Sequence, residues 1–145
     1  MAIDTWMPTL KEILAEIEGI EQVHTYDELP GSLMAFPCLV IMPESGSQSY
    51  GMSAPGIAIH RVKVTLYVAS VFRPEAMGKA VPFIELIRDK LAAHMNLEGM
   101  VSYCLPVSPP DAFYEGPNGL SYGDKVHTGI NFYLVVKEVE SFTVS

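Results

Sequence analysis

Basic residues are scarce in this sequence and widely dispersed. The chain has nine Lys and Arg against 17 Asp and Glu, a formal net charge of −8. Arg61 with Lys63, and Arg88 with Lys90, are the closest basic neighbours along the chain. Binding to duplex nucleic acid needs clustered cations that release counterions from the phosphates. We therefore expect no specific nucleic-acid binding, although nucleic acid could still slide past such an acidic surface without sticking.

Long hydrophobic runs, export signals and abundant cysteine are missing as well. No apolar stretch approaches the ~18–20 residues that a membrane-spanning helix requires. The first residues carry no basic n-region, so we expect neither a signal peptide nor membrane association. The two cysteines, Cys38 and Cys104, both lie within apolar runs. This placement favours buried free thiols in a reducing compartment, with a disulfide as the alternative.

The common catalytic and ligand-binding motifs are absent from the sequence. It contains no G-x-G-x-x-G, P-loop, G-x-S-x-G or H-E-x-x-H motif. The four histidines lie far apart, without the spacing of metal ligands: His24, His60, His94 and His127. We interpret them as surface or strand-edge residues, with a composite zinc site as the alternative. The sequence therefore predicts that the chain is not an enzyme and uses no cofactor or metal.

The length and the apolar content describe one domain with a surplus of hydrophobic residues. A chain of 145 residues fits a single domain over 1–145. Hydrophobic residues make up 49% of the chain and charged residues 18%, against about 25% charged residues in an average domain. The surplus favours contacts between chains, while an apolar active site would give the same composition.

Hydrophobic periodicity predicts an α+β fold. Apolar residues at helical spacing predict one amphipathic helix capped by Asp4 or Thr5 and ended by Gly19, and a second helix over 80–95. Strand patterns occur at 20–26, 38–42, 57–70, 101–107 and 126–139. The order α-β-β-β-α-β-β predicts a mixed, mostly antiparallel sheet with two helices packed on one face. Polar, Gly- and Pro-rich segments predict long loops at 43–56 and 108–125.

The first predicted loop and the start of the next strand form a candidate interface. Tyr50 and Met52 are the large apolar exceptions in that polar loop, and Ile57 and Ile59 fall on the opposite strand parity from the valines that follow. Either a bulge near His60 turns the strand over, or its first third packs against something else, which we favour. A neighbouring subunit could order such an arm through apolar burial and strand pairing. Folding back onto its own domain is the alternative.

Five segments together resemble the tail terminator (tail completion) and neck proteins of long-tailed bacteriophages and prophages. They are IEGIEQVHTY at 17–26, FPCLVIMP at 36–43, VKVTLYV at 62–68, FIELIRDKL at 83–91, and YG at 122–123 leading to GINFYLVV at 129–136. The likeness covers most of the chain in the order and length of its elements.

The resemblance implies a structural virion protein of the tail or neck, assembled in the host cytoplasm. Such a subunit forms a homo-oligomeric ring, commonly a hexamer, that caps the tail tube and joins it to the head. Its partners are other copies, the tail tube protein and the head–tail connector or stopper protein, and DNA passes through its acidic lumen. The family offers no catalytic residues to transfer. A head-side connector or stopper is the first alternative, and a small cytoplasmic ligand-binding domain the second.

Overall fold

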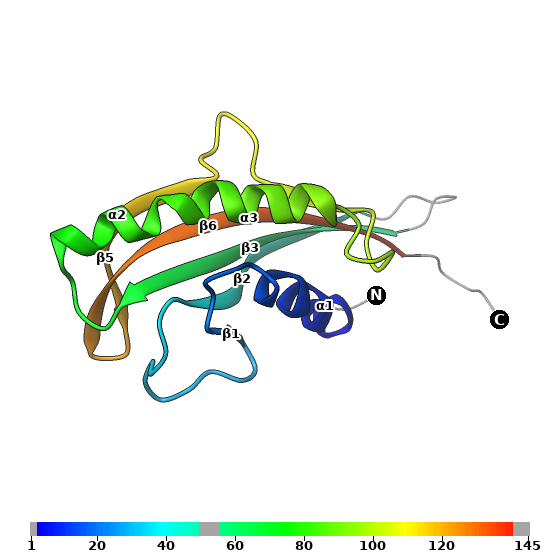
Figure 1. The fold of residues 1–145 in the computed structure, drawn as a ribbon. Coiled ribbons are helices and arrows are strands. Elements are labelled where there is room, and N and C mark those ends of the chain that lie inside the picture. Colours follow the sequence, from blue (N-terminus) through cyan, green and yellow to red (C-terminus); the bar gives the residue numbers. More distant parts are fainter. Residues whose placement is uncertain (1–2, 50–55, 141–145) are drawn as a thin grey trace.

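The computed structural model describes residues 3–49 and 56–140 of the chain. They form two layers, with one six-stranded sheet covered on one side by helices (Figure 1). The strands are β1 (Gln22–Thr25), β2 (Cys38–Ser49), β3 (Gly56–Ala69), β4 (Tyr103–Pro106), β5 (Tyr114–Tyr122) and β6 (Lys125–Glu140). No helix in the described ranges is long and apolar enough to cross a membrane.

The sheet is mixed and mostly antiparallel, as the sequence predicts. Its strand order is β1-β2-β3-β6-β4, and β5 pairs with β6. β1 runs parallel to β2, and every other pair is antiparallel. β4 and β5 follow one another along the same edge of β6, because β4 pairs with its later residues and β5 with its earlier ones. The two central strands, β3 and β6, thus form the longest ladder of the fold.

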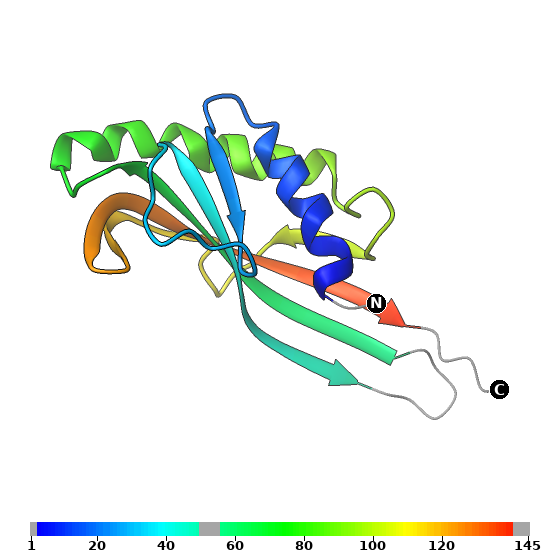
Figure 2. The same cartoon turned by 90° about the horizontal axis from the view of Figure 1, so that it is seen from below.

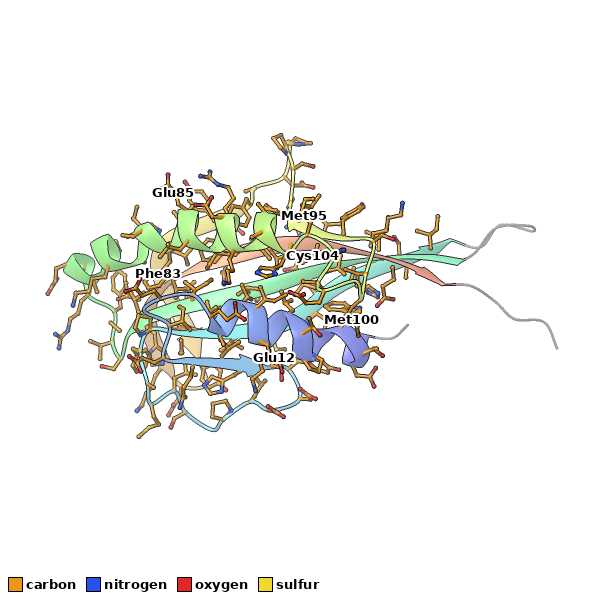
Figure 3. All side chains as sticks on the ribbon, turned by 45° about the vertical axis from the view of Figure 1, so that its right-hand side comes forward. Glu12, Phe83, Glu85, Met95, Met100 and Cys104 are labelled. Carbon is orange, nitrogen blue, oxygen red and sulfur yellow. The ribbon has the colours of Figure 1, made fainter. Side chains whose placement is uncertain are left out.

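Both main helices cover the same side of the sheet, which confirms the predicted arrangement. α1 (Ile3–Ala15) buries Trp6, Leu10 and Leu14, and α3 (Pro82–Ala93) buries Phe83, Ile87 and Leu91. These side chains share one core with the alternate residues Val62, Val64 and Leu66 of β3 and with Phe132, Leu134 and Val136 of β6. Figure 3 shows Phe83 on the inner side of α3 and Glu85 on its outer side.

Prolines and glycines modify the predicted helices in detail. The second predicted helix, 80–95, forms as α3, and the 3-10 turn η1 (Pro74–Ala76) and the short α2 (Met77–Ala80) precede it. α2 and α3 are separate because Pro82 has no backbone N–H to continue the helical bonds. The predicted cap of the first helix is wrong, since Asp4 and Thr5 lie inside α1. Gly19 has φ +97° in the turn that follows α1, a conformation that favours glycine.

Both predicted loops prove too long. Residues 43–49 extend β2 and Gly56 begins β3, so the first predicted loop is wrong there. Half of the second predicted loop, at 108–125, forms β5, which turns back into β6 where Tyr122 pairs with Lys125. The missed strands are polar in composition, and they form because each lies beside a long apolar strand that offers a ladder of backbone partners.

No bulge interrupts β3 near His60. The register with β6 is unbroken from Gly56 to Tyr67, and it shifts between Tyr67 and Ala69. The other irregularity lies in β2, between Pro43 and Ser45. Side chains of β3 therefore alternate strictly along its first twelve positions, so that Ile57 and Ile59 point to the side away from the helices.

Candidate assembly surface

The side of the sheet that faces away from the helices, here called the outer face, is covered along half of its length. At the β1 end, Leu33 and Phe36 of the segment between β1 and β2 pack over Cys38, Val40 and Tyr67. At the other end, α1 reaches almost to the end of β6, where Trp6 contacts Glu138, and the ends of β2 and β3 extend beyond it (Figure 2). No helix or strand of the described residues covers the outer face of this second part, which we call the open half, but Asp111 of the segment between β4 and β5 reaches Arg61 on it.

Three rows of side chains cross the open half, and each combines apolar groups with one cation. Register places Ile59 beside Lys137 and Lys137 beside Tyr103. The next row holds Arg61, Val135 and Leu105, and the third holds Met42, Lys63 and the buried Tyr133. On β2, the first two rows end in serines, Ser47 and Ser45. Ile57 completes the surface at the start of β3. A sheet face exposed to water normally carries polar side chains, so this composition is typical of a surface that contacts protein.

Cations on the open half lie against aromatic rings. The Arg61 guanidinium carbon lies 4.6 Å from the centre of the Tyr133 ring, and Lys137 Nζ lies 5.9 Å from that of Tyr103. Arg61 is also 2.8 Å from Glu44 and 4.0 Å from Asp111. A hydrogen bond with Glu115, together with burial, raises the pKa of Tyr133 to about 12. These contacts hold the long side chains flat on the sheet, which leaves less rotamer entropy to lose on association.

A buried polar cluster ties α1 to the far end of the sheet. Glu138 of β6 is 2% exposed and accepts a hydrogen bond from the indole N–H of the fully buried Trp6. His60 of β3 lies 3.3 Å from the same carboxylate, and the Trp6 and His60 ring centres are 5.8 Å apart. Gly46 of β2 leaves room for the His60 ring, because a Cβ at that glycine would lie 3.2 Å from His60 Nδ1. The cluster fixes α1 on the side of the sheet opposite to the open half.

The four interface residues predicted from the sequence divide into two pairs. Ile57 and Ile59 both lie on the open half, where Ile57 is half-buried and Ile59 is 38% exposed. Tyr50 and Met52 lie outside the described residues. Sequence reasoning missed the aromatic and basic members of the surface, since Tyr103, Tyr133 and Lys137 come from strands far along the chain. Within the predicted strands 101–107 and 126–139, the alternation of side chains places these residues on the side away from the core, and this pattern could have predicted them as members of the surface.

The cysteines and histidines do not gather into a chemical site. Cys38 and Cys104 are both free and buried on opposite sides of the sheet, which confirms the prediction of unpaired thiols. Burial raises the pKa of Cys38 to about 11 and that of Cys104 to about 12, so both stay protonated at neutral pH. Across residues 3–49 and 56–140, no three His, Cys, Asp or Glu side chains are placed to hold a metal ion.

A second exposed apolar group, which the sequence did not predict as a site, lies at the opposite end of the molecule. Val71 and Phe72, between β3 and η1, are each 43% exposed, and Val126 at the start of β6 is 49% exposed. Phe72 and Val126 both approach Gly119 of β5, where an added Cβ would lie 3.1 Å from either side chain. The molecule thus carries apolar surface at both ends of its long axis.

No family model matches the sequence, and no curated protein matches it.

Proposed function

We propose that this chain is a structural subunit that assembles with copies of itself into a ring, and that the ring acts as a phage tail terminator. The observation that carries the proposal is the open half of the outer face. Isoleucine, valine, leucine and tyrosine side chains lie there among serines and cations, at positions where a water-facing sheet is normally polar. A second copy packed there removes these groups from water at about 25 cal/mol per Å².

The shape of the subunit supports self-assembly of this kind. The paired ends of β2 and β3 project past the helices as an arm (Figure 2). Within the part of the chain that the structure describes, no strand pairs with the outer edge of β2 from Met42 to Ser49, since β1 covers Cys38 to Ile41 alone. An unpaired edge invites pairing with another chain. An arm with an apolar face and a free edge is suited to reach a neighbouring subunit.

The terminator role is supported by the resemblance in five segments and by the acidic charge. A ring through which DNA passes must not bind it, and a net charge of −8 repels phosphates. Such a ring would cap the tail tube, stop its polymerisation and connect it to the head.

Oligomeric state tests the proposal directly. We expect mass photometry and negative-stain electron microscopy of the purified full chain to show closed rings of a single size. A chain that remains monomeric at concentrations on the order of 10 µM, where specific interfaces are populated, would contradict it. Mixing the ring with its cognate tail tube protein separates the two neck roles, because a terminator caps tube ends and a head-side connector does not.

A paired substitution locates the contact. Changing Ile57 and Ile59 to serine removes apolar groups of the open half, and we expect ring formation to require at least about tenfold more protein. Val126→Ser is the matched control, because Val126 is also an exposed β-branched strand residue but lies at the far end. Equal weakening by both variants would show that the contact is not on the open half.

A further inference from the structure

Charge is distributed very unevenly along the chain. Residues 1–30 contain seven Asp and Glu and one Lys, a net charge of −6 out of the total of −8. All seven carboxylates are exposed, on α1 and around β1, and together they form what we call the acidic surface: Asp4, Glu12, Glu16, Glu18, Glu21, Asp27 and Glu28. Because the buried side of α1 packs on the sheet, its carboxylates point away from the sheet. The acidic surface therefore belongs to the helical layer.

Most of these carboxylates have no ion-pair partner within the described ranges. Glu16 pairs with Lys90 at 2.9 Å, and Glu28 pairs with Lys11 at 3.0 Å. One groove lies between α1 and the turn after β1, and its charged lining residues are Asp4, Lys11, Glu12, Asp27 and Glu28. This groove holds four carboxylates and one ammonium group, so it favours an incoming cation.

The cations of the open half differ in their partners, since three carboxylates reach this surface: Glu44 and Asp111 at Arg61, and Glu115 at Tyr133. Arg61 is neutralised by Glu44. Lys63 and Lys137 make no ion pair with any residue of the described ranges, and both are half-buried along apolar neighbours. A lysine held in this way keeps its ammonium group at the surface. The open half thus presents two ammonium groups without an ion-pair partner in the described ranges, among both apolar and polar side chains.

We propose that the open half of one copy docks on the acidic surface of the next copy, with Lys63 and Lys137 facing its carboxylates. The inference rests on the proposed function and names the two surfaces that meet in the ring. The occupant is a second copy because the same chain supplies both complementary charges. The two surfaces lie on opposite sides of a two-layer domain, so the contact is head to tail, and repeating it generates a closed ring when the rotation between neighbours closes.

A symmetric pairing of like surfaces is disfavoured by the same charges. Two acidic surfaces in contact would bring carboxylates together, and two open halves would bring lysines together. Both arrangements are unfavourable because like charges across an interface repel each other. Complementary charges also steer approaching subunits, and salt screens this attraction. We therefore expect ring formation by the wild-type chain to weaken as sodium chloride rises from about 0.05 M to about 0.5 M.

Charge reversal on the open half tests the proposal. Lys63→Glu combined with Lys137→Glu should raise the protein concentration needed for ring formation at least about tenfold. Lys79→Glu combined with Lys125→Glu is the matched control, since both of those lysines are exposed elsewhere and the net charge falls to the same −12, four below −8. The control should change that concentration by less than about threefold.

Reversal on the acidic surface gives the sharper discrimination. Glu12→Lys combined with Glu18→Lys reduces the net charge of the chain to −4, which would favour association if overall repulsion were the controlling factor. We expect ring formation to weaken instead. Combining this pair with the two lysine reversals should restore ring formation to within about threefold of the wild-type chain, because the charges are exchanged across the contact. Circular dichroism of each variant checks that the fold is retained.

The outcomes separate this inference from the proposed function. Rings of wild-type stability in the Lys63 and Lys137 double variant, or no rescue in the fourfold variant, overturn the inference and leave ring formation standing. A wild-type chain that forms no ring overturns both.

Discussion

Replacement of Glu138 by leucine is expected to loosen α1 from the sheet. The carboxylate is 2% exposed and contacts the Trp6 indole N–H and, at 3.3 Å, His60 Nε2. Leucine has a similar volume but accepts no hydrogen bond. A buried donor that loses its acceptor costs about 1–3 kcal/mol, and His60 loses its partner as well. The added apolar burial of leucine offsets about 1 kcal/mol, so we expect a net loss of about 2 kcal/mol in the free energy of unfolding.

The assay uses the single tryptophan of the chain. Trp6 is the only indole, so its fluorescence during urea unfolding reports the environment of α1 directly. A loss of about 2 kcal/mol lowers the melting temperature of a domain of this size by roughly 4–8 °C. Glu138→Gln is the control, since its amide oxygen still accepts the indole N–H, and its cost should stay below about 1 kcal/mol. Replacing a buried polar cluster by apolar groups can leave stability unchanged. A leucine variant as stable as the wild-type chain would therefore show that the Glu138 contacts do not stabilise the fold.

Three further predictions concern the core and its titratable groups. Gly129→Ala places a Cβ 1.9 Å from a backbone oxygen of β3, so it should lower the free energy of unfolding by about 3 kcal/mol or more. Gly78→Ala in α2 has open space around it and should raise the free energy of unfolding by about 0.5–1 kcal/mol. Urea unfolding measures both changes. A thiol assay should find Cys38 and Cys104 unreactive in the folded protein and two free thiols after unreduced denaturation, and zero thiols would contradict the structure. Burial, with Lys11 nearby, lowers the pKa of His24, so the unfolded chain binds a proton at His24 more readily than the folded chain does. The free energy of unfolding should therefore fall as the pH drops through about 6.5. His24→Gln should reduce that fall, and a pH profile of stability that the substitution leaves unchanged would contradict the prediction.

Local residue patterns were sufficient to predict the elements that pack on the core. The alternating valines of β3 and the helical spacing of Leu10, Ile13 and Leu14 predict their elements because burying one side of a strand or helix imposes a period that can be read along the chain. Free, buried cysteines followed from apolar runs for the same reason. The α+β class and the placement of both helices on one face followed from the order of these elements.

Tertiary structure alone decided which distant residues became neighbours. β5 and the end of β2 are polar, and they are strands because β6 and β3 supply the backbone partners. Lys63 and Lys137 are far apart in the sequence, but the adjacent strands β3 and β6 place them on the same face of the sheet. The register between strands decides which residues become neighbours, whatever their separation along the chain. Glu138 reads as a solvated carboxylate near the end of the chain. It is buried because α1, more than a hundred residues away, lays Trp6 over it, and a contact of that range leaves no periodic trace in the sequence.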